Sequence, residues 1–337
     1  MAEHRIAGRP AAAATFGESV HGRRLARWSV LGTLFLLAGI LVVVPVLMLI
    51  YASFQTVLPF GGRTGEFTLA NYLDLWSPTM GRALTNTMIV SVGGTVMAMF
   101  IGVGMAWLAA RTDVPGRPLI MLAGVLPLFV SLLVASVTWA LLGSGRSGYL
   151  NILFSTLGLP FTINMQSLGG ITFVHGLYYV PFPFIFLYSA LTLQHPDLEE
   201  AGFVHGARLH NVLGTITFPL VKPALIGSAL LIFVLMAEEF PVPQILGRPV
   251  GIDTLSVRIY ALMTHVPNQP NQAAALSIVL TAIVCALVYT QRRALGGKDY
   301  RTVTGKGVQN RPLRLGIWRW PAFALCALYM FVAIGLP

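Results

Sequence analysis

Long stretches without a charged side chain are the feature that most constrains the fold of this 337-residue chain. Thirty-five uncharged residues separate Arg27 from Arg63, and fifty separate Arg146 from Asp197. Charged residues make up 10% of the sequence, whereas soluble domains carry about 25%. A membrane-spanning helix needs about 20 mostly apolar residues, so we predict an all-α, polytopic membrane helix bundle. The predicted spans are 29–53, 83–110, 118–142, 168–193, 223–245 and 272–291, followed by the start of a truncated seventh at 320–337.

The basic residues indicate how these spans are oriented. With the N-terminus inside, the cytoplasmic segments hold seventeen of the 22 Lys and Arg residues, as the positive-inside rule requires. We therefore predict a multi-pass protein of the cell inner membrane. It has a cytoplasmic N-terminal tail at 1–27, then the first span and an outer loop at 28–81. The net charge of +10 follows from this orientation, so membrane lipid is an expected partner and nucleic acid is not.

The longest internal cytoplasmic loop, 195–222, has a readable local pattern. Pro196 favours the first turn of a short helix, and Glu199 and Glu200 suit the positive end of that helix. The sequence therefore predicts a short helix at the start of the loop.

The residues that follow predict how this short helix is used and where it stops. Ala201 and Gly202 give it a bare face that a partner can approach closely. Gly206 is expected to end or bend the helix. A second short segment follows, and Pro219 and Pro223 are expected to open the next span.

The spacing within this loop resembles that of permease subunits of binding-protein-dependent ABC importers. Their motif reads Glu-Ala-Ala, three residues, Gly, nine residues, Ile, one residue, and Leu-Pro. Every spacing holds here, at Glu200, Ala201, Gly202, Gly206, Ile216, Phe218 and Pro219. Gly202 replaces the second alanine and Phe218 replaces the leucine. The resemblance implies the type I ABC importer transmembrane fold over residues 82–291. The alternative is an amphipathic surface loop without a partner.

The resemblance also implies a set of partners. The loop would form a coupling helix in a groove of a cytoplasmic ABC ATPase dimer, with Glu200 facing basic or polar groups and Gly206 setting the bend. A periplasmic or extracellular substrate-binding protein would deliver the solute, and a second permease half would complete the path. The chain lacks a phosphate-binding Gly-x4-Gly-Lys-Ser/Thr loop, so ATP would be bound by the partner. We therefore expect neither enzyme activity nor a cofactor in this chain.

Two 19-residue stretches resemble one another. Residues 27–45 and 319–337 both begin with Arg-Trp and end in Pro, and Leu36 matches Leu328 at the same offset of 292 positions. The second stretch follows a basic cytoplasmic linker, 292–319. Because transporters are often built from repeats, we hypothesise that the chain is the first half of a tandem permease. An equivalent loop would then lie 292 positions after the first. The alternatives are a second half on a separate subunit and an authentic short tail helix.

Two carboxylates near the end of the fifth predicted span are candidates for the translocation path. Glu238 and Glu239 follow fifteen uncharged residues after Lys222. With a rise of 1.5 Å per residue they lie roughly 24 Å along the helix, near the outer side of a core about 30 Å thick. This depth suits an outer gate or a cation path, and equally a carboxylate pair at the outer interface.

Aromatic and imidazole side chains in the fourth predicted span are further path candidates. His175, Tyr178 and Tyr179 precede two prolines, which are expected to kink the helix. A kinked helix carrying these side chains would border a path. The favoured alternative is a histidine that is hydrogen-bonded between helices.

No residue pattern predicts a catalytic or metal site. The two cysteines, Cys285 and Cys326, lie far apart in apolar runs, and no nucleophile, base or acid pair accompanies His175. Four glycines in the second span indicate close helix packing instead: Gly93, Gly94, Gly102 and Gly104.

The stretch Glu238–Met263 resembles permeases for ferric iron, whose two halves are commonly fused. Similar stretches occur in polyamine and phosphonate permeases, so ferric iron is the first expectation and these are alternatives. An ion-driven secondary transporter or channel is the alternative function. Such proteins usually place several charged groups in mid-membrane, whereas the middle of nearly every predicted span is uncharged here.

Overall fold

The computed structural model describes residues 14–56, 65–145, 147–194, 197–295 and 312–337. These residues are mostly helical, and the extended pairings among them are the isolated bridges Gln55–Phe67 and Thr112–Leu313. The chain divides into two compact units, Met1–Thr68 and Leu69–Pro337, which are described separately.

The first unit consists of helix α1 (Ala14–Ser53) and a short return segment. Residues Trp28–Ser53 are long and apolar enough to cross a membrane, which agrees with the first predicted span. The helix begins at Ala14, so the later half of the predicted tail is helical, and residues 1–13 lie outside the description. After the helix, the ring of Phe54 stacks on that of Phe67 with centroids 5.1 Å apart.

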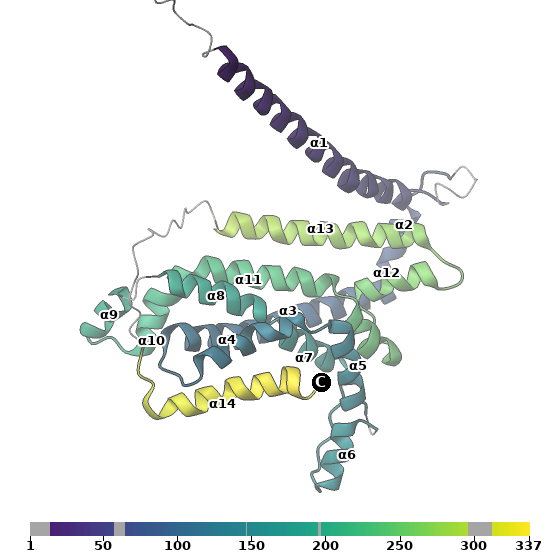
Figure 1. The fold of residues 1–337 in the computed structure, drawn as a ribbon. Coiled ribbons are helices and arrows are strands. Elements are labelled where there is room, and N and C mark those ends of the chain that lie inside the picture. The colour runs from purple at the N-terminus through teal and green to yellow at the C-terminus, as the bar shows by residue number, and fades with distance from the viewer. Residues whose placement is uncertain (1–13, 57–64, 146, 195–196, 296–311) are drawn as a thin grey trace, which may run out of the picture. The chain divides into compact units, whose positions relative to one another are not determined.

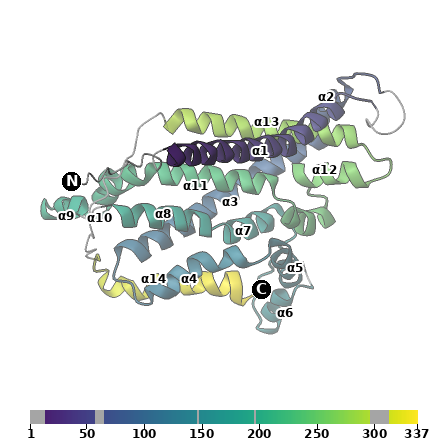
Figure 2. The same ribbon diagram turned by 45° about the horizontal axis from the view of Figure 1, so that its top comes forward.

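The second unit holds the remaining helices. Their order is α2 (Ala70–Leu73), η1 (Asp74–Trp76), α3 (Pro78–Arg111), α4 (Arg117–Val125), η2 (Leu126–Phe129), α5 (Leu132–Leu142), α6 (Tyr149–Thr156), α7 (Leu168–Tyr178), α8 (Pro181–Leu193), α9 (Asp197–Val204), α10 (Leu209–Val212), η3 (Leu213–Thr217), α11 (Phe218–Glu238), η4 (Pro243–Gly247), η5 (Arg248–Val250), α12 (Leu255–Thr264), α13 (Pro270–Leu295), η6 (Gly316–Trp318), α14 (Arg319–Met330) and η7 (Phe331–Gly335). In Figures 1 and 2, α9 and α10 lie at one end of this unit, and α5, α6 and α12 lie at the opposite end.

Six helices of the described chain are long and apolar enough to cross a membrane, and a bent pair would add a seventh. In the second unit the straight candidates are Pro78–Arg111, Leu168–Leu193, Leu209–Glu238, Pro270–Arg293 and Gly316–Gly335. The predicted membrane helix bundle is therefore confirmed. The seventh apolar run is helical and lies within this length class.

Helix α3 forms the centre of the core and packs against α7, α8 and α11. Glycines let its neighbours approach closely. A Cβ atom on Gly102 would lie 2.7 Å from Pro183 Cγ and 2.8 Å from Val180 O, and one on Gly94 would lie 2.7 Å from Met236 Sδ. The predicted close packing thus holds at these glycines. It does not hold at Gly104, where an added Cβ would meet nothing within 4 Å.

The span predicted at 118–142 is not a single continuous helix. The structure has α4 with η2, followed by α5, and the two parts are bent by 98°. Pro127 lies in the 3₁₀ turn at the break, and Val130 and Ser131 then adopt extended backbone with ψ of 126° and 123°. Two successive extended residues interrupt the helical hydrogen bonds, so the apolar run bends sharply between its two parts.

The fifth predicted span, 223–245, is wrong at both ends. The helix runs from Leu209 to Glu238. Pro219 lies in the first turn of α11, as expected, and Pro223 lies inside that helix. The π-helical turn η3 precedes α11 and keeps the chain helical back to Leu209. Glu239 ends the helix with an extended ψ of 136°.

Helix α14 is joined to the core by a reciprocal pair of tyrosine hydrogen bonds. The Tyr178 hydroxyl donates to Ala333 O at 2.9 Å, and the Tyr329 hydroxyl donates to Leu177 O at 3.0 Å. Each hydroxyl therefore satisfies a main-chain carbonyl of the other helix, which fixes α7 against α14 and η7.

Candidate functional site

The loop that carries the permease-like motif contains a short helix with a well-defined end. Gly206 follows α9 with φ +80°, a left-handed conformation that favours glycine. The Ala207 amide donates to Gly202 O at 3.0 Å, and the Gly206 amide donates to Phe203 O at 2.9 Å. These two bonds form a Schellman motif, so Gly206 ends the helix as its position in the sequence predicts.

The small residues of the motif differ in their surroundings. Ala201 is exposed, in keeping with a face open to a partner. A Cβ on Gly202 would lie 3.2 Å from both Ile216 Cδ1 and Val212 Cγ2, so this glycine permits packing inside the chain. The interpretation of Gly202 as part of a bare outer face is therefore wrong. Val204, at the end of α9, is 84% exposed and offers an apolar contact instead.

The other motif residues lie along the same region. Glu200 is in α9, and its side chain lies outside the described part of the structure. Ile216 is half-buried in η3, and Pro219 is exposed in the first turn of α11. The structure thus brings Gly202 and Ile216 together and leaves Ala201 and Pro219 at the surface.

The acidic residue beside the motif, Glu199, takes part in a buried network that the sequence did not indicate. Its Oε1 atom lies 3.4 Å from Arg111 Nε and accepts a hydrogen bond from Thr217 Oγ1 at 2.9 Å. The three residues come from α9, from the last position of α3 and from the end of η3. The sequence placed Glu199 only as a favourable charge at a helix start, and its distance from Arg111 along the chain hid the contact.

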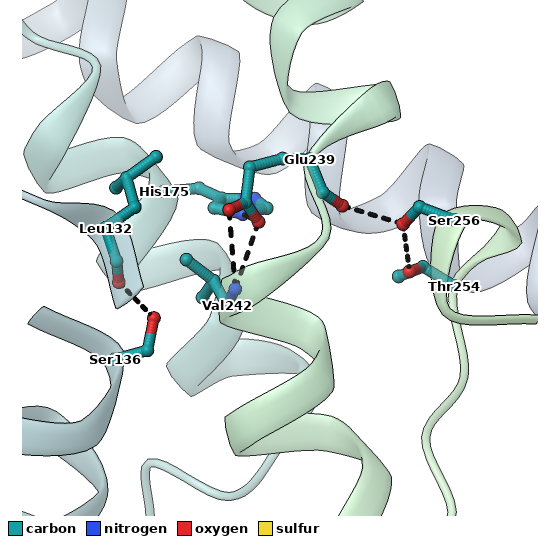
Figure 3. A network of polar contacts seen from close by, with 7 residues as sticks. All are labelled: Leu132, Ser136, His175, Glu239, Val242, Thr254 and Ser256. Carbon is teal, nitrogen blue, oxygen red and sulfur yellow. Dashed lines mark hydrogen bonds and ion pairs between the residues drawn. The ribbon is translucent and has the colours of Figure 1, made fainter. Parts of the chain in front are cut away.

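Two path candidates form a buried pair between helices. His175 Nε2 of α7 lies 2.9 Å from Glu239 Oε2, and both side chains are buried (Figure 3). The Val242 amide donates to the same carboxylate, and Ser256 Oγ donates to Glu239 O at 2.7 Å. The carboxylate therefore caps the segment after the break, and His175 makes a hydrogen bond between helices, the favoured alternative to a path residue.

Of the remaining path candidates, Tyr179 lies beside this pair and the other two do not. Glu238 is exposed although it adjoins the buried Glu239, so the two do not act as a carboxylate pair. The Tyr179 ring lies edge-on to His175 with centroids 6.0 Å apart. Tyr178 instead donates to Ala333 O of η7. The five candidates therefore do not form one site. His175, Glu239 and Tyr179 lie together, Glu238 is exposed, and Tyr178 contacts η7.

Within the described residues, no group of three or more His, Cys, Asp or Glu side chains could hold a metal ion. An apolar cavity of about 160 Å³ lies beside the loop, lined by Trp107, Leu187, Leu191, Leu213 and Thr217 among others. The end of the unit that carries α9 therefore combines an exposed helix with an apolar pocket beside it.

Comparisons of sequence relate the chain to transport proteins. No protein-family model matches it. The ferric transport system permease protein FbpB of Actinobacillus pleuropneumoniae is 29% identical over 261 residues, which cover 72% of this chain and 37% of that protein. The inner membrane ABC transporter permease protein YdcU of Escherichia coli is 27% identical over 276 residues, covering 77% of this chain and 87% of that protein. The chain spans little more than a third of the length of the ferric transport relatives.

Solved structures agree with these sequence relatives in fold. A bacterial ABC transporter involved in the import of the acidic polysaccharide alginate has a chain that superimposes with a TM-score of 0.61 at 19% identity. The match covers 83% of this chain and 99% of the other. The arrangement of helices is therefore the transmembrane fold of an ABC importer permease.

Proposed function

We propose that this chain, a relative of ABC transporter permease proteins with their transmembrane fold, is the membrane-spanning permease of an ATP-driven importer. The observation that carries the proposal is the loop at one end of the bundle (Figure 1). Its helix α9 has the spacing of a coupling helix, ends at Gly206, and exposes Ala201 and Val204. This surface suits an ATPase groove, and the distribution of Lys and Arg favours a cytoplasmic loop and N-terminus.

The mechanism follows from these partners. A substrate-binding protein presents the solute at the outer face, and two ATPase subunits close on ATP at the inner face. Their closure moves α9 and its counterpart on a second permease half, so that the spans alternate between outward- and inward-facing states. ATP is bound and hydrolysed by the partner. This chain supplies the path and the contact through which the movement passes.

The substrate that we propose is ferric iron, handled as cargo. Support comes from the relatives named for ferric transport and from the resemblance of residues 238–263 to ferric permeases. Other relatives are named for spermidine and putrescine transport, and a solved relative in fold imports alginate, so polyamines are the first alternative substrate. The exposed Glu238 is compatible with either cation and does not select between them.

The proposal is tested by recovering the tagged protein from native membranes after crosslinking and identifying the proteins that accompany it. We expect an ABC ATPase with the unaltered chain and its loss with Gly206→Trp. The matched control is Gly251→Trp. Gly251 has φ +74° and, like Gly206, has nothing within 4 Å of an added Cβ, but it lies between η5 and α12.

The two substitutions impose similar backbone strain. A difference in ATPase recovery between them therefore shows that the effect is specific to the loop that contains Gly206. Loss of the ATPase with Gly206→Trp alone supports the proposal. If no ATPase accompanies the unaltered chain, the proposal fails and the ion-driven transporter becomes the leading alternative.

A further inference from the structure

We propose that the buried Arg111–Glu199 pair holds helix α9 to span α3, so that a movement of α9 is passed directly to the membrane helices. The proposal rests on the proposed function and assigns Arg111 and Glu199 as positioning residues. They act through the placement of α9 and contact neither ATP nor the transported solute.

A single carboxylate oxygen joins three helical elements at this point. Glu199 Oε1 of α9 lies 3.4 Å from Arg111 Nε, the last residue of α3, and accepts the hydroxyl of Thr217 at 2.9 Å. Thr217 ends the π turn η3, which leads directly into α11. Glu199 therefore connects the short cytoplasmic helix to two candidate spans, α3 and Leu209–Glu238.

The pair is protected from water. The Arg111 and Glu199 side chains are 3% and 9% exposed, and Thr217 lines the apolar cavity of about 160 Å³ beside them. Charges attract more strongly in such surroundings than at a protein surface, and removing Arg111 leaves the Glu199 carboxylate buried without this counter-charge. An exposed ion pair would be too weak to hold a helix in place, whereas this one is suited to do so.

The end of α3 to which α9 is held is itself braced. The Leu313 amide donates to Arg111 O at 2.8 Å, the Asp113 amide donates to Leu313 O at 3.1 Å, and Asp113 Oδ1 accepts from the Leu315 amide at 2.8 Å. The backbone around Arg111 is thus fixed to the segment that leads into α14. A movement of α9 therefore acts on the C-terminal end of α3, whose backbone is already held by hydrogen bonds.

The apolar packing of α9 and the Arg111–Glu199 ion pair contribute differently to the placement of this helix. Gly202 lets α9 pack on Val212 and Ile216, which keeps the helix against the bundle without setting its direction strongly. The Thr217 hydroxyl adds a directional hydrogen bond, and the Arg111–Glu199 ion pair adds attraction at the same carboxylate oxygen, so that the two together limit the rotation and register of α9. Loss of the pair should therefore loosen the orientation of α9 before it unfolds the bundle.

The test uses substitutions that separate folding from positioning. Arg111→Met removes one charge and leaves the buried Glu199 carboxylate with the Thr217 hydroxyl but without the arginine. The double variant Arg111→Met with Glu199→Leu removes both charges, and replacing a whole buried pair by apolar residues is commonly tolerated. Arg82→Met is the matched control, since Arg82 is an exposed arginine on the same helix.

The first readout needs the chain alone. A spin label on Val204→Cys, in a background with Cys285→Ala and Cys326→Ala, reports the mobility of α9. We expect higher mobility in the double variant at an unchanged melting temperature, and no change with Arg82→Met. A label as immobile in the double variant as in the unaltered chain overturns the proposal, whatever the ATPase does.

The second readout uses the transporter with its ATPase and binding protein. We expect the double variant to retain the ATPase but to lose the stimulation of ATP hydrolysis by loaded binding protein by about tenfold, within the usual range of coupling between sites. Unchanged stimulation overturns the proposal and leaves the proposed function intact. Absence of an ATPase from the unaltered complex overturns the proposed function, and the coupling step with it.

Discussion

At the scale of single residues, His175 and Glu239 show how a polar pair is accommodated inside the bundle. The imidazole and the carboxylate are both buried, and the Val242 amide and the Ser256 hydroxyl complete the hydrogen bonds around Glu239 (Figure 3). The carboxylate stands where α11 ends, so its contacts fix α7 against the start of the next segment. In this conformation the pair is a joint between helices.

Replacing one member of this joint should be costly. We expect Glu239→Ala to lower the free energy of unfolding by about 3–5 kcal/mol, because it leaves the buried imidazole and the Val242 amide without their acceptor. Glu238→Ala is the control: it removes an exposed carboxylate one position earlier and should change stability by less than about 0.5 kcal/mol. Denaturant unfolding of the detergent-solubilised protein measures both. Equal losses would show that the His175 contact does not stabilise the fold.

The sequence predicted the individual chemistry of these residues but not their partners. His175 and Glu239 were both candidates because ionisable groups are rare inside spans, and the contact between them crosses 64 positions of the chain. Glu199 and Arg111 were missed for the same reason. Each lies beside a helix end, where a single charge has an ordinary local explanation. Gly206 was predictable because its role depends on backbone conformation alone.

At the scale of elements, α3 depends on close approach at some glycines and not at others. We expect Gly102→Ala to destabilise the protein by about 1–3 kcal/mol, because the added methyl group would lie within 2.8 Å of Pro183 Cγ and Val180 O. Gly104→Ala, two positions further, meets nothing within 4 Å and should be neutral or slightly stabilising, since alanine favours a helix. The melting temperatures of the two variants in detergent measure this difference in stability. A comparable loss at Gly104 would contradict this description of α3.

Positions of the spans were predictable, but the shapes of two of them were not. Apolar length locates a helix in the sequence, and α1, α3, α7 with α8, and α13 all lie where expected. The bend of 98° between α4 and α5 depends on two extended residues, Val130 and Ser131, inside an uncharged run. The early start at Leu209 depends on the π turn before Pro219. Neither feature changes hydropathy, so a search for uncharged stretches does not detect it.

At the scale of the whole molecule, two buried polar pairs of the second unit, Arg111–Glu199 and His175–Glu239, lie in different parts of the bundle. The Arg111–Glu199 pair joins α9 to α3, and the break at Glu239 leads into η4, which packs against α5. Helices α9 and α5 lie at opposite ends of the unit (Figure 2). Between them run the apolar helices around α3. Under the proposed function, the ATPase would act at the α9 end of this arrangement.

The most direct test of the central claim is the energy source of uptake. Right-side-out membrane vesicles carrying the complete transporter and its binding protein are loaded with or without ATP, and uptake of radioactive ferric iron is followed. We predict uptake that requires internal ATP, survives collapse of the proton and sodium gradients, and is lost with Gly206→Trp but not with Gly251→Trp. Uptake that proceeds without ATP and stops when the ion gradients collapse would contradict the claim and identify an ion-driven transporter.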